Sequence, residues 1–348
     1  MPGLYESRAA DHVGHVAAPV VSIIIVSYNT AELTEACLRS IAAETGHLPH
    51  ELIVVDNASV DGSVDRIRAV APHARLIALD QNIGFAAANN LAAQEARGEY
   101  ILLLNPDTVV KAKAISRLVS FARCCPDARI WGGRTVFGNG SLNAASCHGR
   151  MTTWNLFCRA SGLTGLLSKM EVFNGEAYGD WQRDTVRRVD IVSGCFFLIE
   201  RTLWHDLSGF DTRYFMYGEE ADLCLRAQKY GAQPLVTPEA EIIHYGGASE
   251  TVRADKLVRL LSAKSLLVQR HFKPKRARVG QYLLAAWPLS RMVANAIAAV
   301  VMHSNGHARS AAVWREVWIR RGEWFEGYQD RHRRGRSLTP ADAATRVG

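Results

Sequence analysis

Four short runs of strand character, each followed by a cluster of polar residues, constrain the fold of this chain more than any other feature. The first two runs are rich in Val, Ile and Leu without polar alternation, which is typical of strands covered on both faces. The four runs lie at Val20–Val26, Leu52–Val55, Arg75–Leu79 and Tyr100–Leu104. We therefore expect four strands in the first third of the chain, with at least the first two buried inside a sheet.

Segments with helical patterning separate these runs. They lie at Thr30–Ala43, with Thr30 as the N-cap, at Ser63–Val70 and at the alanine-rich Phe85–Ala96. Strands that alternate with helices predict βαβ units and a parallel sheet with right-handed crossovers. The sequence thus indicates the α/β class.

A polar cluster stands at the carboxyl end of each predicted strand. In parallel sheets of this class, ligands bind beyond the carboxyl ends of the strands. Asn, Asp, Gly and Ser also form turns for purely structural reasons, and for any single cluster that explanation is the simpler one. Four clusters in succession favour a shared binding site. They are Ser27–Asn29, Asp56–Ser63, Asn82–Phe85 and Asn105–Asp107.

The remainder of the chain has weaker patterning. A strand is expected at Val189–Ile199 and a helix at Glu219–Tyr230, before Gly231. Two short strands are expected at Leu235–Val236 and Ile242–Ile243. Residues 137–187 show little periodicity, and we expect an irregular region that faces the substrate. Beyond Ser249 the pattern becomes helical and basic.

Composition limits the class of protein. The chain has 348 residues, enough for one large or two ordinary domains, and its 48% hydrophobic content excludes a disordered or collagen-like chain. The net charge of +7 is uneven, because the residues from Thr251 onward carry 19 Lys and Arg against 6 Asp and Glu. A basic C-terminal region favours contact with an anionic surface.

The cysteines and the absence of common nucleotide motifs narrow the class further. Seven cysteines without a CxxC pair argue against a zinc ribbon or a disulfide scaffold and favour a reduced cytosolic setting. The N-terminal residues lack a cationic start followed by an apolar core, so no signal peptide is expected. Neither a Walker A loop nor a strand-following GxGxxG is present, so ATP and NAD sites are not expected.

Seven segments, taken in order, resemble the inverting glycosyltransferases of family 2. They read SIIIVSYNT, ELIVVDNASVDGS, NIGFAAANN, YILLLNPDT, GCFFLIER, GFDTRYFMYGEEADLCLR and PEAEIIHYGG, and they extend from about Val20 to Ser249. The branch to which they are most similar is the bacterial rhamnosyltransferase type, which builds polysaccharides on a lipid carrier. The resemblance implies a GT-A fold with a mostly parallel central sheet and a nucleotide-diphospho-sugar donor. It also implies a divalent metal ion and direct displacement at the anomeric carbon.

The resemblance assigns residues to the donor nucleotide. Asp56 corresponds to the carboxylate that accepts a hydrogen bond from N3–H of uracil or thymine. The loop that cradles the nucleoside corresponds to Ser27, Tyr28 and Asn29. Further contacts with the nucleotide-sugar are implied for Asn57, Asn82, Gly84, Asn89 and Asn105. For Asn89, a surface amide on the helix is an equal alternative.

The resemblance also implies a metal site. Asn105-Pro106-Asp107 stands where many relatives have Asp-x-Asp, and Mg²⁺ or Mn²⁺ bridged to the donor diphosphate stabilises that leaving group. Only Asp107 is a carboxylate here, and Asn105 offers a neutral carbonyl, which predicts weaker metal binding. His244 corresponds to a third metal or diphosphate contact, with a purely structural histidine as the alternative.

The acceptor hydroxyl must lose its proton as it attacks, so a base is needed near the anomeric carbon. Relatives place a Glu-Asp pair at the start of a helix, the second residue acting as base, and in this chain Glu220 follows Glu219 at that position. Asp222 is the second candidate for the base. An ion pair with Arg226, four residues along the helix, would explain Asp222 structurally.

The basic C-terminal region contains an apolar stretch of spanning length. Val279–Met302 follows the basic segment Arg270–Arg278 and includes Arg291 near its middle, which argues against a transmembrane helix. An interfacial helix on an anionic inner leaflet is the preferred interpretation. An amphipathic helix packed on the catalytic domain is the alternative.

These features predict four parts: a flexible N-terminus (1–19), a GT-A catalytic domain (20–250), a helical basic membrane-proximal extension (251–330) and a flexible tail (331–348). Within the catalytic domain, the nucleotide-sugar half is expected at about 20–110 and the acceptor half at about 111–250. The boundaries follow the resemblance and the change to a basic helical pattern.

The sequence predicts a metal-dependent hexosyltransferase for cell-surface polysaccharides, peripheral at the inner face of the cytoplasmic membrane. It would move a sugar, with rhamnose as the first candidate, from a dTDP- or UDP-sugar to a polyprenyl-diphosphate-linked saccharide. A catalytically impaired sugar-nucleotide-binding protein is the alternative. A sugar-1-phosphate nucleotidyltransferase would need a glycine-rich loop that is missing, and no motif for nucleic-acid binding accompanies the basic region. The sequence does not specify the donor, acceptor, linkage or oligomeric state.

Overall fold

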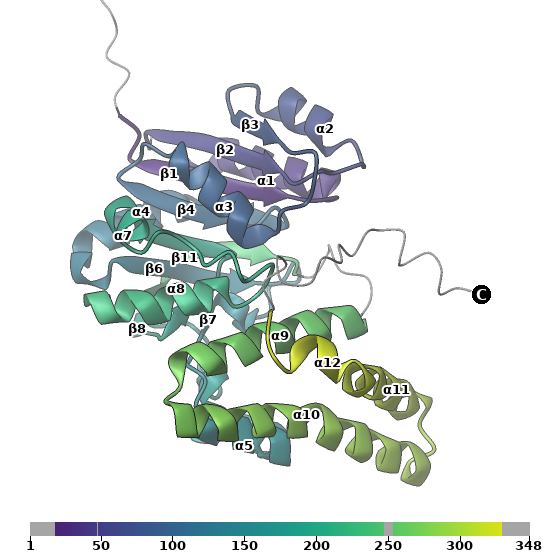
Figure 1. Ribbon diagram of the computed structural model, residues 1–348. Helices are drawn as coiled ribbons and strands as arrows, with labels where there is room; N and C mark the ends of the chain where they lie inside the picture. The colour runs from purple at the N-terminus through teal and green to yellow at the C-terminus, as the bar shows by residue number, and fades with distance from the viewer. Residues whose placement is uncertain (1–17, 47, 247–252, 329–348) are drawn as a thin grey trace, which may run out of the picture.

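The computed structural model describes residues 18–46, 48–246 and 253–328. The predicted flexible tail (331–348) and nearly all of the predicted flexible N-terminus (1–19) lie outside the described residues, as does the expected domain boundary at residue 250. A nine-stranded sheet forms the upper part of the molecule in Figure 1, and a layer of long helices lies below it.

The first half of the sheet is parallel, as predicted. Strands pair in the order β3-β2-β1-β4, and every neighbouring pair among them is parallel. Their bounds are β1 Val21–Ser27, β2 His50–Asp56, β3 Arg75–Ala78 and β4 Tyr100–Leu104. The connecting helices are α1 Ala31–Glu44, α2 Ser63–Val70 and α3 Phe85–Gln94. All of these elements lie within a few residues of the predicted ones.

Two hydrophobic cores cover the two faces of this sheet. Side chains alternate along β1, so that Ile24 packs in one core with the alanines of α3, and Ile23 and Ile25 pack in the other with α1. Because both faces are covered, β1 has no exposed side chain and needs no polar alternation.

The second half of the sheet adds antiparallel strands. β10 (Phe196–Glu200) is antiparallel to both β4 and β6, and β11 is antiparallel to β5 and β8 but parallel to β6. The remaining bounds in this sheet are β5 Thr108–Val110, β6 Ile130–Val136, β8 Arg187–Arg188 and β11 Leu235–His244. β7 (Cys147–His148) and β9 (Ile191–Val192) pair antiparallel in a separate two-stranded sheet. The α/β class is confirmed, with a parallel nucleotide half and a mixed second half.

Several predictions for this half were wrong in detail. The two short strands expected at 235–236 and 242–243 form one strand, β11, interrupted by a register shift between Thr237 and Glu241. The single strand expected at 189–199 is divided into β9 and β10 by a turn at Gly194 and Cys195. Each of these short segments has strand propensity, so pairing with strands distant in sequence determines which segments join and which stay separate.

The helices of this half include two, α5 and α6, in the region that was expected to be irregular. They are α4 Ala114–Cys124, α5 Thr153–Ser161, α6 Leu163–Leu166, α7 Arg201–Asp206 and α8 Glu219–Ala227. Short 3₁₀ turns occur at Pro126–Ala128, Ala144–Ser146, Gly175–Ala177 and Gln228–Tyr230. α5 begins where the Thr152 side chain accepts a hydrogen bond from the backbone N–H of Asn155, and it ends at Gly162.

The C-terminal helices form a third core together with α5. They are α9 Arg253–His271, α10 Pro274–Val301, α11 Asn305–Ile319 and α12 Arg321–Trp324. Leu156 of α5 packs in this core with Leu284 and Trp287 of α10 and Trp314 of α11. The guanidinium of Arg159 on α5 lies over the Trp287 ring at 4.9 Å. The predicted helical extension is confirmed, and α5 joins it from the second half of the catalytic region.

α10 is long and apolar enough to cross a membrane by length and composition, with a mean hydropathy of 1.5 over its best window. One side of it packs on α5, α9 and α11. The outer side carries exposed apolar side chains at helical spacing: Val279, Tyr282, Leu289, Val293, Ile297 and Val300. We call these six residues the α10 stripe. Arg291 lies elsewhere on the helix, with its guanidinium beside Gly165 of α6.

Candidate active site

A cavity of about 1240 Å³ runs from the carboxyl ends of β1 and β4 to the C-terminal helices. This volume exceeds the range of about 300–1,000 Å³ usual for a single small ligand. The strand ends, the start of α8, the segment 148–153 and α9 all contribute side chains to its wall. The cavity therefore has room for two substrates.

Three of the predicted nucleotide residues line the cavity together. Tyr28 follows β1, Asn57 follows β2, and Asn82 precedes α3. Asn57 Nδ2 donates to Asn82 Oδ1 at 3.1 Å, and Asn57 Oδ1 accepts from the backbone N–H of Ile83 at 2.9 Å. Asn57 thus holds the 82–84 loop against the end of β2.

Asp56 is 1% exposed at the end of β2 and has one carboxylate oxygen without a partner. Its Oδ2 accepts from the backbone N–H of Ser59 at 2.9 Å, whereas Oδ1 is buried and makes no hydrogen bond among the described residues. A buried carboxylate oxygen without a hydrogen-bond donor lowers the stability of the folded protein. A donor such as the N3–H of a pyrimidine base would satisfy it.

Asp56 does not line the cavity, and neither do four other predicted nucleotide residues, which support the site from neighbouring positions. The Ser27 hydroxyl turns inward to Thr34 Oγ1 at 2.9 Å, and Asn29 accepts from the backbone N–H of Val60 at 2.9 Å. Asn89 is buried, not on the surface, and donates to the Phe85 carbonyl within its own helix at 2.9 Å.

Gly84, the fourth of these, allows a close backbone approach, but to another part of the chain. Its φ is +87°, and a Cβ there would lie 2.6 Å from the Phe215 carbonyl oxygen. The backbone N–H of Phe85 donates to that same oxygen at 2.9 Å. Glycine is needed at this position because the segment before α8 packs directly on it.

Asn105, Asp107 and His244 gather at the centre of the cavity. His244 Nε2 lies 3.3 Å from Asp107 Oδ1 and 3.4 Å from Asn105 Nδ2. The backbone carbonyl of His244 accepts from Asn143 Nδ2 at 3.1 Å, which anchors the end of β11. Burial by itself would lower the pKa of His244, but hydrogen bonds to Asp107 and Cys195 outweigh this effect and raise it to about 10.

These three side chains fit a divalent cation that a diphosphate also holds. One carboxylate with neutral oxygen and imidazole ligands leaves several coordination positions to substrate phosphates and water, as Mg²⁺ and Mn²⁺ sites commonly do. His244 Nδ1 is buried without a partner. The described residues contain no group of three or more His, Cys, Asp and Glu side chains arranged around a metal position, so the phosphates would be essential ligands.

Glu219 and Glu220 begin α8 and both line the cavity. Gly218, with φ +86°, is the N-cap, and Tyr217 before it also has a positive φ of 70°. This turn points the start of α8 at the cavity. Burial raises the pKa of both carboxyls, and the charge of Glu220 adds to the effect on Glu219. Glu219 Oε2 is buried without a hydrogen-bond partner among the described residues.

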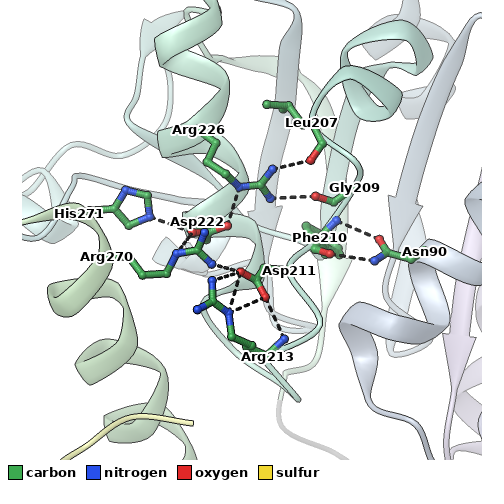
Figure 2. Close-up of polar contacts among 10 residues, drawn as sticks. All are labelled: Asn90, Leu207, Gly209, Phe210, Asp211, Arg213, Asp222, Arg226, Arg270 and His271. Carbon is green, nitrogen blue, oxygen red and sulfur yellow. Dashed lines mark hydrogen bonds and ion pairs between the residues drawn. The ribbon is translucent and has the colours of Figure 1, made fainter. Parts of the chain in front are cut away.

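Asp222 lies one turn into the same helix but does not line the cavity. It is 0% exposed, and its carboxylate accepts from Arg226 Nε at 2.7 Å and contacts His271 Nε2 at 2.8 Å (Figure 2). Burial raises its pKa, but the hydrogen bonds to His271 and Arg226 outweigh this and leave the pKa lowered. Arg226 also donates to the Leu207 and Gly209 carbonyls. The geometry is that of a structural link between α8 and α9.

The cavity also contains residues that the sequence patterns did not indicate. Glu176 lies between Lys264 of α9, at 2.7 Å, and Arg159 of α5, at 3.4 Å. These residues come from segments far apart in the chain and have no local motif. Only the packing of α5 against α9 and α10 brings them to the cavity.

The arrangement of the sheet is that of the GT-A fold. The fold is similar to that of a solved mannosyltransferase, PcManGT from Pyrobaculum calidifontis in complex with GDP-Man and Mn²⁺, with a TM-score of 0.54, 17% identity and 88% of each chain covered. Residues 22–172 match the family model for glycosyl transferase family 2, so the chain carries a glycosyltransferase domain of this family.

Curated relatives agree with this family. The N-acetylglucosaminyl-diphospho-decaprenol L-rhamnosyltransferase of Mycobacterium tuberculosis (strain H37Rv) is 26% identical over 237 residues, which are 65% of this chain and 76% of the relative. The rhamnosyltransferase WbbL of Escherichia coli K12 is 28% identical over 242 residues, 65% of this chain and 83% of the relative. The O-antigen biosynthesis protein RfbC of Myxococcus xanthus is 28% identical over 242 residues, but these are only 18% of its length. The chain thus matches only a small part of some relatives and most of others.

Proposed function

We propose that this protein is an inverting, metal-dependent glycosyltransferase that moves a sugar from a dTDP- or UDP-sugar to a lipid-linked saccharide. Rhamnose is the first candidate sugar, and a polyprenyl diphosphate is the carrier. The product would serve cell-surface polysaccharide synthesis. The observation that carries this proposal is one cavity with the Asn105, Asp107 and His244 cluster and the pair Glu219 and Glu220 in its wall.

Different residues of the chain would bind the donor and activate the acceptor. The unpartnered Asp56 oxygen would accept from a pyrimidine N3–H, which favours uracil or thymine over guanine. Asn105, Asp107 and His244 would hold Mg²⁺ or Mn²⁺, which supplies charge neutralisation to the departing diphosphate. Glu220 would take the proton of the acceptor hydroxyl as that oxygen attacks the anomeric carbon from the face opposite the leaving group.

The relatives support the choice of substrates. Two of them are named rhamnosyltransferases, and the name of the mycobacterial one states a diphospho-decaprenol acceptor. A further relative, the succinoglycan biosynthesis protein ExoO of Rhizobium meliloti, is 26% identical over 264 residues. These similarities favour a saccharide acceptor on a lipid diphosphate over a protein or a free sugar.

Nucleoside diphosphate release from a panel of sugar nucleotides tests the proposal. We expect slow release from one dTDP- or UDP-sugar in the presence of Mn²⁺ or Mg²⁺, and not from GDP-sugars. Asp107→Ala is expected to lower this rate by roughly 100-fold or more, because the diphosphate loses the only carboxylate of its metal site. EDTA should have the same effect on the wild-type protein.

The same measurement separates the alternative. A sugar-nucleotide-binding protein without catalysis would bind one nucleotide yet release none, even when a lipid-linked acceptor is supplied. That result would overturn the proposal. Asn82→Ala provides a comparison, since it removes a nucleotide contact outside the metal site and should weaken donor binding more than it lowers the maximal rate.

We further propose that the protein lies on the cytoplasmic face of the membrane through the α10 stripe. The opposite side of α10 packs on protein, which favours a helix lying in the interface over one that spans the bilayer. Exposed Lys275 and Arg278 at the start of α10 complement anionic headgroups.

Vesicle binding tests the attachment. The double variant Val293→Asp/Ile297→Asp is expected to lower partitioning onto phosphatidylglycerol vesicles by roughly tenfold or more, because two apolar side chains no longer enter the interface. Val60→Asp is the matched control, as Val60 is 90% exposed in the nucleotide half of the sheet. Equal partitioning of the wild type and the double variant would contradict the proposed orientation.

A further inference from the structure

We propose that the end of the cavity under the C-terminal helices is a diphosphate subsite for the lipid-linked acceptor, separate from the donor diphosphate site. This inference rests on the proposed function, because it names how the acceptor of that reaction is recognised. Its ligand class is an isoprenyl diphosphate, and its principal residues are Lys273 and Arg276.

Unpaired cations collect at this end of the cavity. Lys273 of the α9–α10 turn and Arg276 of α10 are three residues apart and line it, whereas Lys256, which also lines the cavity, lies at the other end of α9. Within the described part of the chain, none of the three has a carboxylate oxygen within 4 Å, whereas most other arginines near the cavity are paired, as Arg150 is with Asp190. Two neighbouring cations without counter-ions, Lys273 and Arg276, attract a polyanionic ligand.

The deeper wall adds positive charge and no free anion. Burial by itself would raise the pKa of Glu176, but the charges of Lys264 and Arg159 outweigh it and lower the pKa to about 2. Glu176 is therefore ionised and is balanced by these two basic side chains, so it is not a free anion in the wall. The acidic side chains that remain in the cavity, Asp107, Glu219 and Glu220, belong to the donor and proton-transfer regions.

The position of the subsite matches the shape of a lipid diphosphate. Lys273 precedes α10 and Arg276 is in its first turn. The α10 stripe begins at Val279, about one turn further along the same helix. A diphosphate at Lys273 and Arg276 would thus sit where the cavity meets the proposed membrane surface. Its saccharide could extend toward Glu220 and its hydrocarbon chain into the bilayer.

Direct binding of farnesyl diphosphate to the full chain, measured by titration calorimetry in EDTA, tests this subsite. We expect the wild type to bind farnesyl diphosphate at least about tenfold more tightly than farnesol, because the recognised group is the diphosphate. Binding should persist in EDTA and, in a second titration with Mn²⁺, under saturating UDP or dTDP. Inorganic pyrophosphate should compete, whereas displacement by the nucleotides would place the ligand in the donor site and overturn the inference.

Matched variants separate a built subsite from diffuse charge. Lys273→Gln/Arg276→Gln is expected to weaken farnesyl diphosphate binding about tenfold or more. Lys275→Gln/Arg278→Gln removes the same charge from the same exposed turn, but neither residue lines the cavity, so the change should stay within about twofold. Equal losses in both variants would overturn the proposal, as would no loss in either. All four side chains are exposed, and unchanged thermal unfolding verifies that each variant is folded.

Nucleoside diphosphate release, measured without an acceptor, tests the proposed function independently of farnesyl diphosphate binding. Release by the wild type together with absence of farnesyl diphosphate binding would overturn only the subsite. Farnesyl diphosphate binding that depends on Lys273 and Arg276 would support the subsite even if every donor failed to react.

Discussion

Replacement of Glu220 by Gln is expected to lower sugar transfer by about 10²–10⁴-fold, the range usual for loss of a general base. Gln has nearly the same shape as Glu but cannot accept the proton of the acceptor hydroxyl. The side chain lines the cavity and lies in the first turn of α8, so the fold does not depend on its charge. Transfer to a lipid-linked acceptor and donor binding should be measured together, because only transfer should fall.

The same substitution is expected to increase stability at about pH 8. Burial raises the pKa of Glu220 in the folded protein above its ordinary value of 4.5. At a pH between 4.5 and the raised pKa, the Glu220 carboxyl is ionised in the unfolded chain but still protonated in the folded one. Unfolding then releases a proton, so the free energy of unfolding falls as the pH rises. Gln is neutral in both states. The unfolding temperature of the Glu220→Gln variant should therefore exceed that of the wild type at pH 8 and equal it near pH 4.

Glu219→Gln is the control for the base assignment. The pKa of Glu219 is also raised by burial, so this variant should gain stability at pH 8 as well. It should keep much more transfer than Glu220→Gln, and the wild-type kcat/KM should rise with pH through the raised pKa of the base. Loss of transfer in Glu219→Gln alone would assign the base to Glu219 and contradict the prediction.

Asp222→Asn is expected to destabilise the protein by about 3–5 kcal/mol, the cost of removing one partner from a buried ion pair. The Asp222 carboxylate is fully buried between Arg226 and His271, with Arg270 Nε at 3.5 Å. An amide leaves the guanidiniums of Arg226 and Arg270 without their shared counter-charge. Figure 2 shows that α8 and α9 meet at this carboxylate, so their packing should loosen.

Urea unfolding measures this effect. Asp65→Asn is the comparison, because its i, i+3 pair with Arg68 is exposed and should contribute no more than about 1 kcal/mol. If Asp222→Asn unfolds at the wild-type urea concentration but has lost transfer, the carboxylate acts in the reaction and the structural assignment is wrong.

The parallel half of the fold was predictable because its signals are local. Val21–Ser27 and Tyr100–Leu104 are continuous apolar runs, and a helix follows the first with a clear start. The second half depends on antiparallel partners distant in sequence, so β9 and β10 could not be separated and β11 could not be joined. α5 was missed because its core partners, Leu284 and Trp314, lie more than a hundred residues away.

The candidate site likewise has residues that the sequence could predict and residues that it could not. Strand ends meet at one edge by the geometry of a parallel sheet, and this brings Tyr28, Asn57 and Asp107 to the cavity as expected. Side-chain direction is not given by position in a motif, so the sequence could not show that Ser27 and Asn89 turn into the interior. Arg159 and Lys264 reach the cavity only through helix packing, which no local pattern records.

The insertion of α5 among the C-terminal helices has a consequence for the modularity of this enzyme. Leu156 shares a core with α10, while Leu266 and Leu267 of α9 pack in the core that covers the sheet. Apolar residues on each side of the expected boundary at residue 250 thus pack in the core on the other side. The C-terminal helices are not an appendage that can be exchanged or cut away, and a chain shortened to the family-matched segment would expose two cores at once. Evolutionary change in the proposed membrane-facing surface is therefore expected by substitution on the outer side of α10, because its inner side packs on the rest of the protein.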